Sequence, residues 1–202
     1  TRVYAKTKNE SGMKQLLLLL LATTAAVGQT PSSMVVTTQW LAARLGRPDI
    51  VVIQVGPDRK QYEAAHIPGA RFLALSEISV TREGLANELP PAEQLKRAFE
   101  STGVADGLRV VLYSENANLY AARAWWTLDY LGHAADAALL DGSIDKWKDE
   151  NRPLTADVPI PAQAKLTPHL HPEVLVTRPE VALASDKALH EKPPAIALID
   201  AR

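Results

Sequence analysis

The residues most suggestive of chemistry lie in the stretch RVVLYSENANLYAARAWW, residues 109–126. Its pattern predicts a buried strand, the short polar loop Ser114–Asn118 and then a helix. A loop between the carboxyl end of a strand and a helix N-terminus is a common place for an anion site or an activated nucleophile, because free N–H groups there favour negative charge. This loop has no histidine and no glycine cradle, and the chain has no cysteine. The position is typical of a reactive site, but its residues are not.

A second candidate group lies in YEAAHIPGARFL, residues 62–73. Pro68 and Gly69 predict a tight turn that leads into a strand. We interpret Tyr62 and His66 as side chains that tie this turn to its neighbours by hydrogen bonds, in preference to a catalytic role for His66.

On the helix after the loop, Arg123 is expected to point back toward the loop, where it could pair with Glu115, pack, or bind an anion. Trp125 and Trp126 are adjacent, so they lie about 100° apart around the helix. One can face the sheet while the other meets a second surface, such as another domain.

The remaining chemistry-bearing residues indicate no metal or cofactor. His169 and His171 have a metal-like spacing, but they stand beside prolines in a linker, and we interpret them as structural. The sequence shows no P-loop, no dinucleotide-binding fingerprint and no convincing carboxylate pair.

The composition is that of a globular protein: 202 residues, 47% hydrophobic and 22% charged, with a formal net charge of −1. No basic stripe occurs, which argues against a nucleic-acid partner. The absence of cysteine excludes disulfides, thiolate metal sites and thiol nucleophiles within these residues.

The amino terminus is expected to lie outside the fold. The segment that starts at Met13 has the order of a secretory signal peptide: a lysine, then six leucines (Leu16–Leu21), then small residues. Its apolar core is too short to span a bilayer. We interpret residues 1–28 as an upstream remnant and a signal peptide, with cleavage after Ala26 or Gly28. The protein is therefore predicted to be exported, periplasmic or secreted, without a stable membrane anchor, since no cysteine is present for a lipid.

Alternating strands and helices predict an α/β domain over residues 35–150, with a mostly parallel central sheet flanked by helices. Thr38 and Asn118 are expected to cap two of the helices, and Gly46 and Gly132 to end them. Strands are expected at 50–55, 70–75, 109–113 and 135–140, and helices after Thr38 and within 90–103, 118–132 and 143–150.

Eight of the fourteen prolines fall between Pro153 and Pro194, which predicts a proline-rich linker over residues 151–176. Beyond it, a helix capped by Thr177 and a strand in AIALIDAR (195–202) repeat the order found at 37–55. We interpret residues 177–202 as the beginning of a second copy of the domain, and the chain as a fragment.

The motifs together resemble the rhodanese family. The resemblance rests on the Tyr62 to Leu73 signature, on RVVLYS and YAARAWWTLDYLGH around the loop, and on LLDGSIDKW (139–147). It covers about residues 37–150 and resumes at 177–202. One departure is IQVG at 53–56, where the family has aspartate and arginine; the second copy, LIDAR, keeps both.

The resemblance implies a tandem-domain sulfurtransferase that uses thiosulfate or 3-mercaptopyruvate. Sulfane sulfur would pass to cyanide or a thiol through a persulfide on a cysteine directly after the central strand. Ser114 stands at that place here, and a hydroxyl cannot substitute for the thiolate. The family commonly places the cysteine in the second domain, so residues 35–150 are expected to be the non-catalytic first domain, with its own second domain as a partner.

Two alternatives stay open. A rhodanese-like domain without cysteine could be a binding or regulatory module, and a phosphatase-like relative would again need a loop cysteine. The residues do not decide which sulfur donor or acceptor is used.

Overall fold

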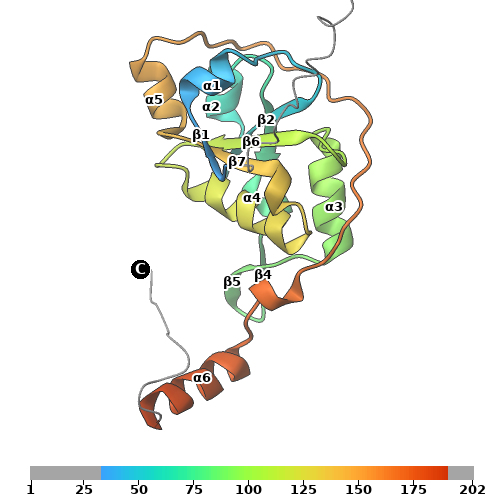
Figure 1. Cartoon of the computed structure of the whole chain (residues 1–202), viewed down its shortest axis with the longest axis vertical. Coiled ribbons are helices and arrows are strands. Elements are labelled where there is room, and N and C mark those ends of the chain that lie inside the picture. The colour runs from blue at the N-terminus through green and yellow to red at the C-terminus, as the bar shows by residue number, and fades with distance from the viewer. Residues whose placement is uncertain (1–32, 191–202) are drawn as a thin grey trace, which may run out of the picture. The chain divides into compact units, whose positions relative to one another are not determined.

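In the computed structural model, which describes residues 33–190, five parallel strands form one central sheet (Figure 1). Its strand order is β1 (Val35–Val36), β7 (Ala137–Leu140), β6 (Arg109–Ser114), β2 (Ile50–Gly56) and β3 (Arg71–Ala74). Of the three inner strands, β6 and β2 are the longest, and both are nearly continuous apolar runs, as expected where helices cover both faces of a parallel sheet. The predicted fold class is confirmed.

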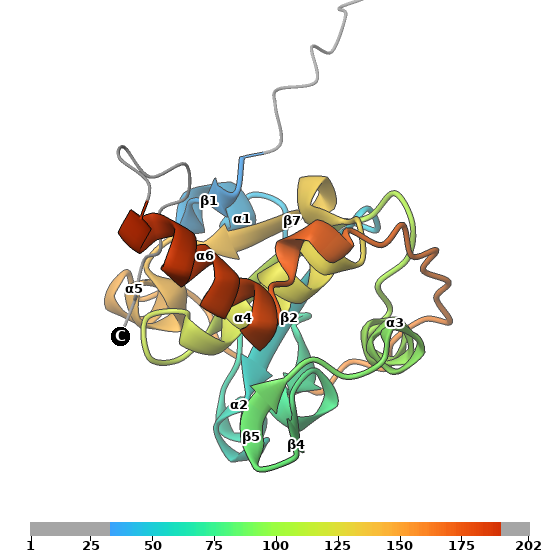
Figure 2. The same cartoon turned by 90° about the horizontal axis from the view of Figure 1, so that it is seen from below.

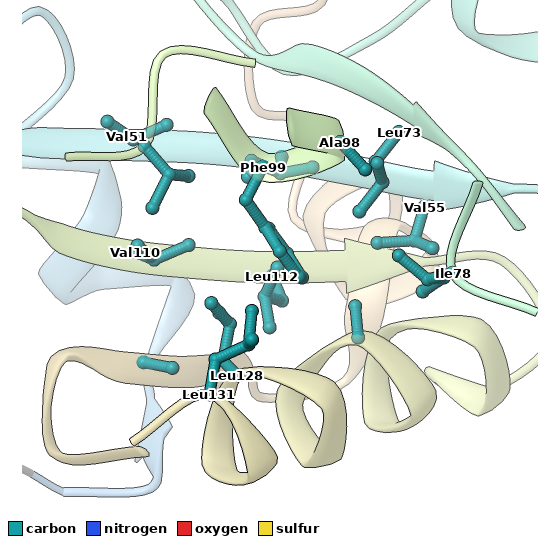
Figure 3. Packing of buried hydrophobic residues seen from close by; sticks show 14 of the residues in the cluster. Val51, Val55, Leu73, Ile78, Ala98, Phe99, Val110, Leu112, Leu128 and Leu131 are labelled. Atoms are coloured by element: carbon teal, nitrogen blue, oxygen red, sulfur yellow. The ribbon is translucent and has the colours of Figure 1, made fainter. Parts of the chain in front are cut away.

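Helices α3 (Ala92–Ser101) and α4 (Leu119–Tyr130) cover one face of the sheet. Their buried side chains pack against the strand residues that point to that face, and Figure 3 shows this core. It includes Val51, Val55, Leu73, Ala98, Phe99, Val110, Leu112 and Leu128.

The opposite face is covered by α1 (Thr38–Ala42) and α5 (Ser143–Asp149). Here Leu41, Ile144 and Trp147 pack against Val52, Val111 and Tyr113, the alternate residues of β2 and β6. Figure 1 shows the two layers, with α4 on one side of the sheet and α1, α2 (Lys60–Ala64) and α5 on the other.

Two predicted helix caps are wrong in detail. Thr37, rather than Thr38, caps α1: its side chain accepts a hydrogen bond from the N–H of Trp40, whereas Thr38 is buried. Asn118 occupies the N-cap position of α4, but its side chain makes no capping hydrogen bond. It is used inside the loop instead, as described below. Gly132 follows α4 at φ +84°, a conformation that favours glycine, as predicted for a helix end.

A small antiparallel hairpin, β4 (Val80–Arg82) and β5 (Leu85–Glu88), was not predicted (Figure 2). Its strands are only three and four residues long and are mostly polar, so they carry no recognisable periodicity. The short 3₁₀ turns η1 (Leu75–Glu77), η2 (Ala134–Asp136) and η3 (Pro172–Val174) complete the elements of the domain and its linker.

The predicted proline-rich linker follows the domain surface closely. Thr155 and His66 exchange two backbone hydrogen bonds of 2.9 Å each. Further along, Thr167 donates to the carboxylate of Asp106 from both its N–H and its hydroxyl, and Leu166 is buried in the core beside α3 and α4. The linker is therefore part of the folded unit, although its sequence has no regular period.

Helix α6 (Arg178–His190) forms where the second copy was predicted to begin. Glu180 accepts hydrogen bonds from both the N–H and the hydroxyl of Thr177, so its carboxylate satisfies the backbone donor at the predicted capping residue. The predicted strand 195–202 and the signal peptide 1–28 lie outside the described residues. Among the helices within residues 33–190, none has the length and apolar character needed to cross a bilayer.

Candidate functional site

The loop Ser114–Asn118 joins the carboxyl end of β6 to the start of α4, as predicted. Three consecutive residues, Asn116, Ala117 and Asn118, have φ values of +54°, +53° and +67°. Such left-handed backbone costs about 1–2 kcal/mol for an ordinary residue, and asparagine tolerates it better than alanine. The loop is thus held in a conformation that its surroundings must enforce, which is common at functional sites.

Ser114 is fully buried and its polar atoms are all engaged. The hydroxyl donates to the carbonyl of Glu115 at 2.9 Å and accepts from the N–H of Ala121 at 3.3 Å. Its carbonyl accepts from the hydroxyl of Ser143. Because the hydroxyl proton is held by a backbone carbonyl rather than by a base, the side chain is not an activated nucleophile.

Asn118 connects the loop to two strands. Its Oδ1 accepts from the N–H of Ser114 at 3.1 Å, and its Nδ2 donates to the carbonyl of Leu140 at 2.6 Å. Sequence reasoning assigned this side chain to the helix cap, because the partner at the end of β7 is 22 residues away and is brought close only by the sheet.

Beside the loop lies a hollow of about 130 Å³ at the carboxyl ends of β2 and β6. We call it the loop hollow; it is lined by Gln54, Val55, Gly56, Pro57, Asp58, Gln61, Glu115, Asn116 and Tyr120. Two of these residues carry carboxylates, and none of the described lining residues is basic. An anionic ligand would therefore meet like charge here, although the loop backbone occupies a position that often binds anions.

Gln54, one of the residues that line the loop hollow, is hydrogen-bonded to the buried Tyr113. The Tyr113 hydroxyl donates to Oε1 of Gln54 at 3.0 Å and accepts from the N–H of Ile67 at 3.2 Å. Burial raises the pKa of the Tyr113 phenol far above its usual range, so this group remains a hydrogen-bond donor. Sequence reasoning noted the departure at Gln54 but did not predict this contact.

His66 and Tyr62 perform the predicted structural role. His66 Nδ1 lies 2.6 Å from the carbonyl oxygen of Tyr62, and Nε2 lies 3.1 Å from that of Asp157. The Tyr62 ring stacks on the imidazole, and its hydroxyl donates to the carbonyl of Ala70. These contacts tie the Pro68–Gly69 turn to α2 and to the linker.

Of the roles expected for Arg123, the structure shows packing; an ion pair with Glu115 does not occur among residues 33–190. Arg123 instead donates to the carbonyls of Ile78 and Glu88, both at 3.3 Å, and its guanidinium lies over the Trp126 ring. Ile78 follows the 3₁₀ turn η1 and Glu88 ends the unpredicted strand β5, so neither acceptor could be identified from the sequence. Burial lowers the pKa of the Arg123 guanidinium, and its role here is packing.

The two tryptophans face different surroundings, as their spacing indicated. Trp125 packs against the core under α4 and donates to the carbonyl of Ala137. Trp126 lines a separate hollow together with Leu85 and Leu89 near the hairpin, and with Leu175 at the end of the linker.

The two linker histidines help to attach the linker to the end of α4. The N–H groups of His169 and His171 donate to the carbonyls of Leu131 and Tyr130, each at 2.9 Å. Within residues 33–190, no group of three or more potential ligands is arranged to hold a metal ion.

The rhodanese-like domain family matches residues 37–150 of the chain. A probable 3-mercaptopyruvate sulfurtransferase of Pseudomonas aeruginosa is 32% identical over 185 residues, which are 85% of this chain and 62% of the relative. A thiosulfate sulfurtransferase of Azotobacter vinelandii is 30% identical over 68% of this chain and 50% of its own length. The sulfur carrier protein TtuD of Thermus thermophilus is 32% identical over 66% of this chain and 46% of its own length.

Among solved structures, the 3-mercaptopyruvate sulfotransferase SseA of Escherichia coli superposes with a TM-score of 0.70 at 25% identity. The match covers 77% of this chain and 63% of that one. The chain thus spans between about half and two thirds of the length of these relatives.

Proposed function

The chain belongs to the rhodanese family, and on this premise we propose that it supplies the non-catalytic first domain of a two-domain sulfurtransferase. The named relatives are sulfurtransferases and a sulfur carrier, and the chain covers only part of their length. Thiosulfate or 3-mercaptopyruvate would be the sulfur donor, and cyanide or a thiol the acceptor.

The observation that carries the proposal is the state of Ser114. Sulfur transfer by this family's chemistry needs a thiolate that attacks the sulfane sulfur of the donor and keeps it as a persulfide. For thiosulfate, sulfite leaves with the electron pair of the broken S–S bond, and the acceptor then takes the outer sulfur and frees the thiolate. Ser114 is buried, hydrogen-bonded to carbonyl and amide groups, and unable to take part in this exchange.

The electrostatics of the loop hollow support the same assignment. Thiosulfate is a dianion and 3-mercaptopyruvate a carboxylate, and the two carboxylates of Asp58 and Glu115 would repel either donor. The proposed catalytic cysteine would stand in a second domain, in a short loop after a strand some 60–90 residues beyond Arg202. The helix α6 would be the first helix of that domain.

Comparison of two proteins tests the proposal: the 202-residue chain and the product of the complete gene. The chain alone is expected to form no thiocyanate from thiosulfate and cyanide above background, and Ser114→Ala is expected to change nothing. The longer product is expected to be active and to lose activity when its loop cysteine is replaced by serine.

Thiocyanate formation by the chain alone that is abolished in Ser114→Ala would contradict the non-catalytic assignment. A complete gene product that lacks a loop cysteine and activity would instead favour the second candidate, a rhodanese-like binding or regulatory module. The observation that favours this alternative is the ordered left-handed loop, which carries no nucleophile.

A further inference from the structure

A second hollow, of about 350 Å³, lies at the opposite edge of the sheet from the loop. We call it the arginine hollow, because Arg44, Arg47 and Arg71 line it. It is bounded by the start of β2, by the turn before β3, and by the linker residues between Pro159 and Ala164. Since β6 is six residues long, about 20 Å separates this edge from the loop Ser114–Asn118.

Charge in the arginine hollow is unbalanced. None of the described residues that line it is acidic. Arg47 is neutralised by Asp49, which it contacts through two hydrogen bonds of 2.9 and 2.8 Å. Asp49 lies outside the lining, and no ion pair of Arg44 or Arg71 occurs within residues 33–190. Two guanidinium groups therefore border the same space without a carboxylate of their own.

Arg71 is the more unusual of the two. Its Nη1 donates to the carbonyl of Thr102 at 2.7 Å, and the guanidinium lies against Gly103, where any larger residue would collide with it. Its Nε is buried and has no hydrogen-bond partner. Burial lowers the pKa of the Arg71 guanidinium, as expected for a charge that is partly desolvated without an anion beside it. Because Nε is enclosed by protein, a ligand in the hollow would contact Arg71 through Nη2, which makes no hydrogen bond to the described residues and is not among the buried atoms.

The side chain of Arg44, just after α1, is positioned by Trp40. Its guanidinium lies 4.5 Å from the centre of the Trp40 ring, and its Nη1 donates to the Trp40 carbonyl. Stacking and a carbonyl contact leave other N–H groups of the planar guanidinium free to bind a ligand. The position of this side chain does not depend on a ligand being present.

From this geometry we propose that the arginine hollow binds a small oxyanion, such as a phosphate group, between Arg44 and Arg71 beneath the linker. Guanidinium groups recognise tetrahedral oxyanions through paired, charge-assisted hydrogen bonds. The volume lies at the lower end of the range for small-molecule sites, which suits a phosphate or a small phosphorylated compound. The inference is independent of the proposed sulfurtransferase function, because the hollow lies at the other edge of the sheet.

The test is a titration of the ¹⁵N-labelled 202-residue chain with inorganic phosphate, at constant ionic strength maintained with chloride, followed by amide chemical shifts. Saturable shifts are expected at Gly69, at Gly103 and in the linker segment 159–164. Arg44→Gln is expected to weaken binding at least about tenfold, because a hydrogen bond to a charged group is lost.

Arg97→Gln is the matched control, since Arg97 is an exposed arginine of α3 outside the hollow and its loss changes the net charge equally. It is expected to bind phosphate as the unchanged chain does. Arg71→Gln should also weaken binding, but Arg71 supports the end of α3, so Arg44→Gln decides if that variant fails to fold. Absence of saturable shifts, shifts confined to the loop 114–118, or equal weakening in Arg97→Gln would overturn the proposal.

Discussion

Replacing Asn118 by alanine is expected to lower the free energy of unfolding by about 2–4 kcal/mol. The side chain accepts from the N–H of Ser114 and donates to the carbonyl of Leu140, and each hydrogen bond is worth about 1 kcal/mol net. Alanine at φ +67° adds about 1 kcal/mol, because asparagine tolerates the left-handed region better. The change therefore tests whether the loop conformation is enforced by this one side chain.

Two further variants separate the contributions. Asn118→Gly removes the same hydrogen bonds without the backbone penalty, so a loss of about 1–3 kcal/mol is expected. Asn116→Ala carries the backbone penalty alone, because Asn116 is exposed, has φ +54° and forms no side-chain hydrogen bond within the described residues. Its expected loss is about 1 kcal/mol.

Urea unfolding followed by tryptophan fluorescence measures all three variants, with the midpoint and the slope fitted together. Asn118→Ala should be the least stable, and Asn116→Ala the most stable of the three. If Asn118→Ala and Asn116→Ala were equally destabilised, the hydrogen bonds of Asn118 would contribute nothing, and the reasoning on the loop would be refuted.

Three further predictions concern the linker and the leader. Leu166→Ala should destabilise the chain by about 2–5 kcal/mol in the same urea assay, because Leu166 is buried in the core; a loss below about 0.5 kcal/mol would mean that the linker is not part of the folded unit. Hydrogen bonds from Thr167 lower the pKa of Asp106 in the folded chain. The contact therefore stabilises the fold fully above the unfolded pKa of about 3.9, and this stabilisation is lost as the pH falls through the folded pKa. Acidification from about pH 6 to pH 3 should therefore destabilise the parent chain more than Asp106→Asn, and equal losses would contradict this role. In an exporting bacterium, mass spectrometry should find a new amino terminus near residues 27–30, whereas an intact Met13 terminus in the cytoplasm would argue against the proposed export.

The sequence determined the sheet and the family. Continuous apolar runs such as 50–55 and 109–113 can be buried only between two helical layers, so local pattern and tertiary environment agree there. The turn signature around His66 and the absence of cysteine were also visible in the sequence, because each depends on residue identity within a short stretch. These features allowed the fold, and a loop without a thiol after β6, to be predicted.

The tertiary structure decided the partners of the polar side chains. Asn118 contacts Leu140, Arg123 contacts the carbonyls of Ile78 and Glu88, and Arg71 contacts Thr102, each across 22 to 45 residues of chain. A polar side chain has several acceptors of similar strength within reach, and only the packing of strands and helices selects one of them. The hollows beside the loop and around Arg44 depend on that same packing, since their walls come from segments that are far apart in the sequence.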